Sequence, residues 1–446
     1  MKGLLTAIKH EKEPVYFITY EGLRRDRADA KRAMFAKLGE TIDFDAGKVY
    51  ADELFAKKIG EEIDKNCKKI SCNFSERING DVEALVGRMK QSLEEAARLL
   101  AKKVYMSAPI VVRYHNDADG LSGAIALHRA MHGYENAVWE MHRSVAYAKS
   151  DAENDTLIAN AYESIEKPLL VLIDFGTTPD SNDGIEAAKE RFDIIWLDHH
   201  PISSGFSGAK LDYYINPWNF GGDSNFTAGL LASVFASCFG AQTKDLAYAS
   251  LLGDYSAYAK PNAQAKRVAM LLDIVSSDAK LVGSHTGNVT PEAVENIMHD
   301  ESKVTEIIAY GENRLAELLD SAVSGLKVYK GKSSSIYVAD FEKIRSDEER
   351  YPLPGRFASK LMEKIEESGN AKALVVLHYG SYISLRLGSG LKGINLLEVL
   401  EKVKSYYPSL VESAGGHMSA ASIKLAKEGN KKPVLGKLVE ELKGIV

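Results

Sequence analysis

The strongest constraint on the fold of this chain is a series of short apolar runs separated by helical segments. Ile110–Val112, Leu169–Ile173 and Phe192–Leu197 are such runs, and each is followed by acidic residues or histidines. Buried strands that alternate with helices are typical of a parallel sheet covered on both faces. We therefore expect a doubly wound α/β domain, in which a ligand site lies outside the carboxyl ends of the strands.

A second α/β pattern follows at the carboxyl-terminal end. It contains apolar runs at Ser335–Phe341, Ala373–His378, Tyr382–Leu387 and Ala420–Leu425. The expected fold is a doubly wound, mostly parallel α/β domain joined by helices to a smaller α/β domain, with the active cleft between them. The expected divisions are a region of unknown role (1–80), the first α/β domain with its lead-in helix (81–259), a helical connector (260–330) and the second unit (331–446).

Residues 1 to about 80 give mixed signals. Val15–Tyr20 is strand-like, while Leu23–Leu38 and the stretch near Asp52–Lys65 suggest charged helices. Asp81–Lys103 carries apolar residues at helical spacing and is expected to form an amphipathic helix.

Composition narrows the class of protein. A length of 446 residues with 45% hydrophobic and 26% charged residues is typical of a globular protein with two or three domains. The formal net charge of −6 argues against a protein that coats nucleic acid nonspecifically, because phosphate contacts drive that binding. The longest apolar stretch, Ala228 to Ala241, is too short to span a bilayer and is expected to be a buried helix.

The sequence also predicts the cellular compartment of the protein and the state of its cysteines. The amino terminus has no pattern of a secretory signal, and the three cysteines, Cys67, Cys72 and Cys238, do not form a disulfide framework. We therefore expect a cytoplasmic protein with no membrane partner. Cys67 and Cys72 could be half of a zinc site, but without a second Cys or Cys/His pair nearby they are expected to be two ordinary thiols.

Acids and imidazoles gather where the predicted strands end. The first run leads into His115, Asp117 and Asp119, the second into Asp174, and the third into Asp198-His199-His200, while Asp254 closes a helical segment. Neighbouring parallel strands end at one edge of a sheet, so these groups are expected to converge. Acids that repel one another need cations to neutralise them.

The types of donor atom limit which cation can bind. Carboxylates with imidazoles and without thiolate suit Mn²⁺, with Mg²⁺ as the alternative. Asp174 follows the neighbouring strand and is well placed to bridge two ions. Two divalent ions about 3.5–4 Å apart are the usual arrangement for hydrolysis of phosphate esters.

Each motif taken alone has a structural explanation. Asp117-Ala118-Asp119-Gly120 could be a turn or a helix start, His199-His200 could be surface residues, and Gly253-Asp254 is a weak signal. Their joint occurrence in this order favours a metal site.

These ordered motifs resemble those of the DHH phosphoesterases, in which Asp198-His199-His200 is similar to the tripeptide that names the family. His115-x-Asp117-x-Asp119-Gly120, Asp174 with Gly176, and Gly253-Asp254 resemble its other motifs. Ser384-Leu385-Arg386 and Gly415-Gly416-His417 resemble a DHHA1-type domain of the RecJ-like branch. The His-Asn-Asp-Ala-Asp-Gly form looks closest to archaeal RecJ-like single-strand nucleases, whereas bacterial RecJ usually begins this motif with Asp.

The resemblance implies a role for each matched residue. His115, Asp117 and Asp174 would hold one metal ion, and Asp119, Asp174, His199 and Asp254 the other. Asp198 would orient an imidazole, and His200 would face the scissile phosphate. The implied substrate-binding residues are Ser384, Arg386, Gly415, Gly416 and His417.

The resemblance also implies a reaction and partners. The reaction would be metal-dependent phosphodiester hydrolysis by a single-strand-specific exonuclease acting on DNA or RNA in replication or repair, with replication proteins such as GINS as partners. One alternative is an oligoribonuclease or cyclic-dinucleotide phosphodiesterase. Another is a non-catalytic replication scaffold of the Cdc45 branch, which the complete set of ligand positions disfavours. A pyrophosphatase is disfavoured, because the Gly-Gly-His domain type differs from the carboxyl-terminal domain of that family.

Residues outside these motifs are expected to be structural. His128, His132, His142 and His378 fit core or surface positions, while Trp218 and Phe220 could provide stacking surfaces for bases.

Overall fold

The computed structural model describes residues 1–28, 30–144, 146–260, 262–345 and 350–445. The chain divides into two compact units. Unit 1 comprises Met1–Ala269 and Asn288–Glu295, and unit 2 comprises Met270–Gly287 and Asn296–Val446. Each unit is described by itself.

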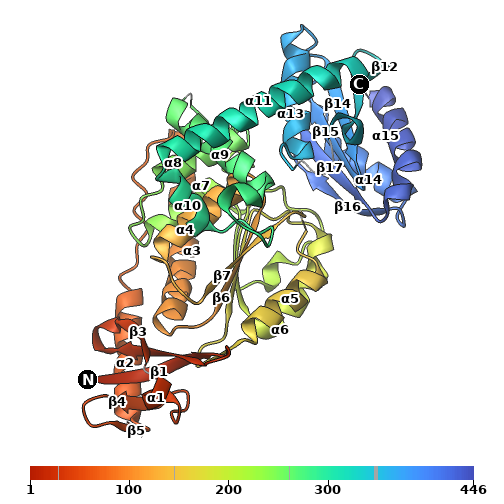
Figure 1. The fold of residues 1–446 in the computed structure, drawn as a ribbon. Coiled ribbons are helices and arrows are strands. Elements are labelled where there is room, and N and C mark those ends of the chain that lie inside the picture. The colour runs from red at the N-terminus through yellow and green to blue at the C-terminus, as the bar shows by residue number, and fades with distance from the viewer. Residues whose placement is uncertain (29, 145, 261, 346–349, 446) are drawn as a thin grey trace. The chain divides into compact units, whose positions relative to one another are not determined.

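Unit 1 begins with a small antiparallel sheet, drawn in red in Figure 1. Its strands are β1 (Lys2–Lys9), β2 (Val15–Tyr20), β3 (Arg25–Ala28), β4 (Thr41–Asp43) and β5 (Lys48–Tyr50), in the order β3-β2-β1-β4-β5. β8 (Tyr162–Ser164) also pairs with β1. The expected helix at Leu23–Leu38 is therefore wrong, because among the described residues of this range only α1 (Ala30–Ala33) is α-helical. Pairing of β3 with β2 overrides the local helix preference of its charged residues.

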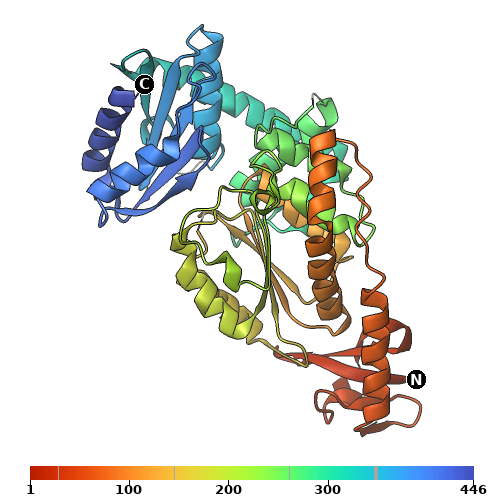
Figure 2. The same cartoon turned by 180° about the vertical axis from the view of Figure 1, so that it is seen from behind.

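Two long helices follow this sheet, and an extended segment connects them. The helices are α2 (Glu53–Cys67) and α3 (Gly80–Tyr105), and Figure 2 shows the orange connecting segment beside α3. Cys72 of this segment forms a disulfide with Cys238, so the expectation of an ordinary thiol is wrong for Cys72. The partners lie 166 residues apart, which explains why local sequence gave no sign of the bond. Cys67 is a free, buried cysteine.

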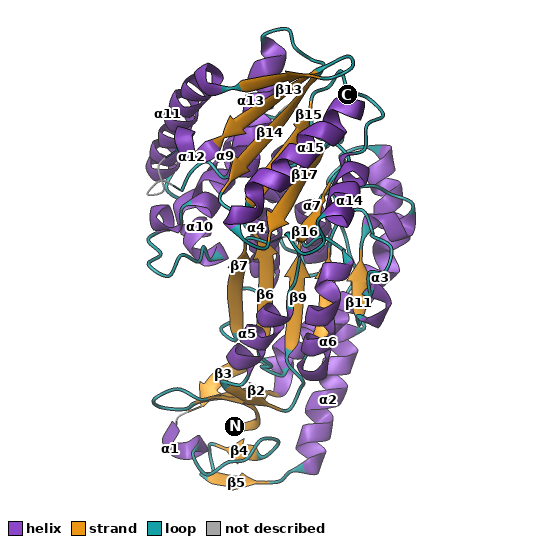
Figure 3. Cartoon of the chain, turned by 90° about the vertical axis from the view of Figure 1, so that its right-hand side faces the viewer, coloured by secondary structure: helices purple, strands orange, loops and turns teal. Residues whose placement is uncertain are grey.

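The centre of unit 1 is a parallel sheet. Its strands are β6 (Ile110–His115), β7 (Ala137–His142), β9 (Leu169–Ile173), β10 (Asp193–Leu197) and β11 (Tyr213–Ile215), in the order β11-β10-β9-β6-β7. All neighbours pair in parallel, and Figure 3 shows β7, β6 and β9 side by side. The chain continues from β6 towards one edge and from β9 towards the other. The ends of β6 and β9 therefore form the topological switch point, where such sheets bind ligands.

Helices cover both faces of this sheet. α5 (Lys149–Ala159) and α6 (Asn182–Arg191) lie on one face, where Ala152 and Ile185 join the apolar cluster around Trp196. α4 (Ala118–Ala130) lies on the other face and packs against α7 (Ala228–Ser237) and α8 (Lys244–Gly253). Every residue of α7 is buried, which confirms the expected buried helix.

Unit 2 contains the second sheet, and the helix α11 (Glu301–Gly325) precedes it. The strands are β12 (Lys327–Lys330), β13 (Ser335–Asp340), β14 (Ala373–Tyr379), β15 (Tyr382–Leu387), β16 (Val411–Gly416) and β17 (Ala420–Leu425). β13 and β14 pair in parallel, and the other neighbours in the order β12-β13-β14-β15-β17-β16 are antiparallel.

Helices also cover both faces of the second sheet. α12 (Phe341–Ile344) and α13 (Pro354–Glu367) pack on one face, and α14 (Leu396–Tyr406) and α15 (Lys431–Ile445) on the other. The residues between the two sheets also include α9 (Ala263–Ser277) and α10 (Pro291–Met298). Both units are thus mixed α/β structures. No helix in the described ranges is long and apolar enough to cross a membrane.

Candidate metal centre

The first part of the candidate site is the junction between β6 and α4. Asp117 is the N-cap of α4, and its Oδ1 accepts a hydrogen bond of 2.9 Å from the Gly120 amide. Its Oδ2 lies 2.8 Å from His115 Nδ1. A Cβ atom at Gly120 would lie 2.4 Å from the carbonyl oxygen of His115, so the turn requires glycine. This tight turn places one imidazole and one carboxylate at the switch point.

Asp174 lies directly after β9 and faces both halves of the site. Its side chain is only 2% exposed, and its Oδ1 is buried without a hydrogen-bond partner. Oδ1 lies 3.4 Å from His199 Nε2, while Oδ2 lies 3.7 Å from His115 Nδ1. The backbone φ of 64° is unusual for a residue other than glycine, and such conformations cluster at functional sites.

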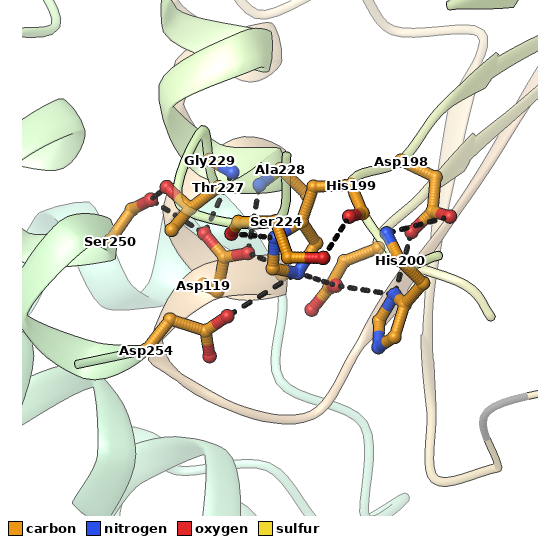
Figure 4. Close-up of polar contacts among 12 residues, drawn as sticks. Asp119, Asp198, His199, His200, Ser224, Thr227, Ala228, Gly229, Ser250 and Asp254 are labelled. Atoms are coloured by element: carbon orange, nitrogen blue, oxygen red, sulfur yellow. Dashed lines mark hydrogen bonds and ion pairs between the residues drawn. The ribbon is translucent and has the colours of Figure 1, made fainter. Parts of the chain in front are cut away.

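Three carboxylates surround His199, as Figure 4 shows in part. Its Nε2 lies 3.3 Å from Asp254, 3.4 Å from Asp174 and 3.5 Å from Asp119. The Nδ1 atom lies 2.8 Å from the carbonyl oxygen of Ser224. A carbonyl can only accept, so Nδ1 carries the proton and the lone pair of Nε2 can face a cation among the acids.

Asp119 is held in place by the start of α7. Its carboxylate accepts hydrogen bonds from the amides of Ala228 (2.9 Å) and Gly229 (2.8 Å) and from Ser250 Oγ (2.5 Å) (Figure 4). A helix N-terminus stabilises negative charge, which offsets part of the cost of burying this acid. Sequence reasoning missed these partners, because backbone amides carry no residue signature and Ser250 lies far along the chain.

Asp198 contacts the neighbouring imidazole, His200. Asp198 Oδ1 lies 2.8 Å from His200 Nδ1, and Oδ2 accepts from the His200 amide at 3.2 Å. Asn216 also donates to Asp198 Oδ2 at 3.3 Å. Asp198 therefore orients His200, whereas the Ser224 carbonyl orients His199.

The electrostatics of the site indicate an excess of negative charge. Burial and repulsion from Asp174 raise the pKa of Asp119 to about 7. Burial and repulsion from Asp119 also raise the pKa of Asp254 well above its usual value. Burial is the largest single influence on His115 and would lower its pKa, but the charge and hydrogen bond of Asp117, together with the charges of Asp174 and Asp254, outweigh burial and raise that pKa to about 9. All three shifts show that the site favours added positive charge.

The donor set fits divalent cations. Among the described residues, three groups whose ligand atoms lie within 4.8 Å of one another share Asp174: His115 with Asp117 and Asp174, Asp119 with Asp174 and His199, and Asp174 with Asp198 and His200. The donors are carboxylate oxygens and imidazole nitrogens, which suit Mn²⁺ and Mg²⁺. The unpartnered Oδ1 of Asp174 is an acceptor that a cation would satisfy.

The expected substrate-binding residues of unit 2 gather on three adjacent strands. Ser384 of β15 pairs with Ser422 of β17, which in turn pairs with Gly415 of β16. Gly416 has a φ of 125°, which favours glycine, and leads into His417 at the β16–β17 turn.

Arg386 lies two residues beyond Ser384 on β15. It donates to Ser359 Oγ (2.8 Å) and to the carbonyl oxygens of Leu385 (2.8 Å) and Gly355 (3.0 Å). These bonds fix the guanidinium against the start of α13.

Trp218 provides an aromatic surface next to His199. It lies in the short helix η4 (Pro217–Phe220), and its indole nitrogen donates to the carbonyl oxygen of His199 at 3.2 Å. The residue is 40% exposed. An anchored, exposed indole can stack on a base.

Comparison with known proteins identifies the middle of the chain. Residues 109–253 match the N-terminal domain of the DHH family. An uncharacterized protein of Methanocaldococcus jannaschii is 25% identical over 457 residues, covering 88% of this chain. The match spans 58% of that relative's length.

Two solved structures share the fold. One is described as the DHH domain of a member of the s1p family of ribosomal proteins, with a TM-score of 0.71 at 20% identity, covering 87% of this chain and 98% of that one. The other is RecJ from Thermus thermophilus in complex with Mn²⁺, with a TM-score of 0.51 at 17% identity, covering 79% of this chain and 55% of that one.

Proposed function

Because residues 109–253 of this chain carry a DHH family N-terminal domain, we propose that it is a divalent-metal-dependent phosphodiesterase that removes nucleotides from an end of single-stranded nucleic acid. The observation that carries the proposal is the ring of Asp119, Asp174 and Asp254 within 3.3–3.5 Å of His199 Nε2. Such a site supplies activated water and neutralises phosphate charge when divalent ions are bound. Mn²⁺ is the preferred ion, as in the RecJ complex of similar fold, and Mg²⁺ is the alternative.

Each proposed role follows from a position in the site. His115, Asp117 and Asp174 hold one cation, and Asp119, Asp174, His199 and Asp254 hold the other. Asp198 orients His200 through a hydrogen bond of 2.8 Å, so that the far nitrogen of His200 faces the scissile phosphate. A His200 imidazole in this position stabilises phosphate charge or protonates the leaving oxygen.

The single-strand preference rests on different observations. An acidic chain with a net charge of −6 binds nucleic acid through a few local contacts. Trp218 offers a stacking surface for an unpaired base beside His199. Ser384, Arg386, Gly415, Gly416 and His417 would grip substrate phosphates. Replication proteins such as GINS are proposed partners, and the cytoplasm is the proposed location.

The test uses end-labelled single-stranded DNA and RNA with Mn²⁺, Mg²⁺ or excess chelator. We expect release of short products with Mn²⁺ and none with chelator, because the acids of the site need cations to bind a phosphate. Full activity in chelator contradicts the metal-dependent reaction.

A length series separates the exonuclease from the alternative enzymes. Strong preference for oligonucleotides of two to five residues, or for a cyclic dinucleotide, contradicts the exonuclease. Tight binding of single strands without cleavage under any metal would instead indicate a non-catalytic scaffold.

A further inference from the structure

A second group of possible metal ligands lies in unit 2, within the second sheet. Asp340 ends β13, His378 lies near the end of β14, and Glu342 is in the following helix α12. Asp340 and His378 are direct neighbours on these parallel strands. One ligand atom from each of the three side chains lies within 4.8 Å of the others.

The side chains of Asp340 and His378 approach each other, but their facing polar atoms are not hydrogen-bonded. His378 Nδ1 lies 3.7 Å from Asp340 Oδ1, which is too far for a hydrogen bond. Both atoms are buried, and neither has a hydrogen-bond partner. Unpaired buried polar atoms are costly, and each one in a native structure requires an explanation.

An ion pair does not explain this contact. Burial is the largest influence on His378 and lowers its pKa, although Asp340 acts in the opposite direction. The lowered pKa favours the neutral imidazole, whose nitrogen lone pair can bind a metal ion beside the Asp340 carboxylate.

We propose that Asp340, Glu342 and His378 form a divalent-cation site in unit 2, with Zn²⁺ as the ion that suits them best. Zinc accepts imidazole nitrogen and carboxylate oxygen at about 2.0–2.2 Å. Two ligands on a tetrahedral ion are then roughly 3.3–3.6 Å apart, from these bond lengths. The observed 3.7 Å between His378 Nδ1 and Asp340 Oδ1 is close to that separation.

The surroundings hold the third ligand in position. Lys431 Nζ lies 2.6 Å from Glu342 Oε2, and the Gly380 amide donates to Oε1 at 3.2 Å. Each carboxylate oxygen has a second lone pair, so Glu342 can bind a cation while it keeps these partners. Lys343 lies 3.6 Å from Asp340 Oδ2 but is 79% exposed, so solvent screens its repulsion of an ion.

Alternation along the strands places the site on a defined face of the sheet. Val338 and Val376, two residues before Asp340 and His378, belong to the core beneath α14 and α15. Side chains two residues apart point to the same face, so the proposed ion lies at the end of that core. An ion there would tie β13, β14 and α12 together.

The experiment measures Zn²⁺ binding to the full chain by equilibrium dialysis. The wild type and the variants His378→Gln and Asp340→Asn are compared with His299→Gln and Asp320→Asn, which change exposed residues of the same unit. We expect His378→Gln and Asp340→Asn to bind one Zn²⁺ per chain fewer than the wild type, and both controls to match it. Equal stoichiometry and affinity in all five proteins would overturn the proposal.

Two further variants keep the result decisive. If His378→Gln or Asp340→Asn changes the circular dichroism spectrum, Glu342→Gln replaces it, because the Glu342 side chain is partly exposed and its loss opens no core cavity. Asp174→Asn removes a proposed ligand of the candidate metal centre in unit 1. The variant should therefore still bind the ion at Asp340, Glu342 and His378. Loss of this ion from Asp174→Asn would contradict an independent site, whatever the outcome for the phosphodiesterase.

Discussion

At the scale of single residues, Asp174 is the position that connects both halves of the candidate metal centre. Its two carboxylate oxygens face different imidazoles, Oδ1 towards His199 and Oδ2 towards His115. A side chain with this placement can join two cations, whereas each of the other acids is proposed to bind one.

Asp174→Asn should therefore abolish most of the activity. Loss of a group that only supports a metal ligand costs about 10–100-fold, so loss of a shared ligand should cost more than about 100-fold in kcat. The measurement is turnover of end-labelled single strands with Mn²⁺, beside Asp183→Asn, an exposed acid of α6, as the control. Turnover within a few-fold of the wild type would show that Asp174 does not bridge two ions.

Metal affinity should depend on pH in one direction. The pKa of Asp119 is raised to about 7 by burial and by Asp174, and the pKa of His115 is raised to about 9 because Asp117, Asp174 and Asp254 together outweigh burial. Both groups must lose their protons before they bind a cation, so raised pKa values weaken binding at low pH. The apparent Kd for Mn²⁺ should rise as pH falls from 8 to 6, with proton release on binding. Calorimetry in buffers of different ionisation enthalpy measures both, and a Kd independent of pH contradicts the assignment.

At the scale of secondary-structure elements, α7 connects the buried core to the chemistry of the site. The helix is wholly buried, and its first amides hold the Asp119 carboxylate. Gly229 lies at this contact, where an added Cβ would lie 2.7 Å from Ser250 Cβ and 2.8 Å from the Asp119 carbonyl oxygen.

Gly229→Ala should lower both stability and Mn²⁺ affinity. Overpacking of a tight contact typically costs about 1–3 kcal/mol, and displaced amides would no longer hold Asp119. Gly87→Ala is the matched control in α3, because no atom lies within 4 Å of a Cβ there. That control should gain about 0.5–1 kcal/mol, because alanine favours helix more than glycine does. Urea unfolding measures both changes, and equal stability of the two variants would refute the crowded contact.

The same elements show what sequence can and cannot predict. β6, β9 and β10 could be predicted because strands buried on both faces are continuous apolar runs, and their ends mark the site. The amino-terminal sheet could not, because β3 is a charged edge strand whose identity depends on pairing with β2. Two interactions join distant segments of the chain: the hydrogen bonds from the first amides of α7 to Asp119, and the disulfide between Cys72 and Cys238. No local sequence pattern indicates either of them.

At the scale of the whole molecule, charge sets how the chain can bind nucleic acid. With Lys+Arg 56 against Asp+Glu 62, no general positive field attracts a polyanion. The proposed phosphodiesterase must therefore rely on a few cationic contacts and on the bound metal ions. Affinity for single strands should then fall only gently with salt, because each phosphate contact adds about 0.7 to the log–log slope.

Arg386→Ala tests whether one of these contacts lies on β15. If Arg386 grips a phosphate, its loss should weaken binding and reduce the salt slope by about 0.7, while Mn²⁺ binding is retained. Arg27→Ala is the control, because Arg27 is a 61% exposed surface cation of β3 and its removal changes the net charge equally. Fluorescence anisotropy of labelled single strands across a salt series measures the slope for both variants. If Arg386→Ala leaves affinity and slope unchanged but lowers the urea midpoint, the bonds from Arg386 to Ser359 and Gly355 are structural, and the phosphate contact must lie elsewhere in the protein.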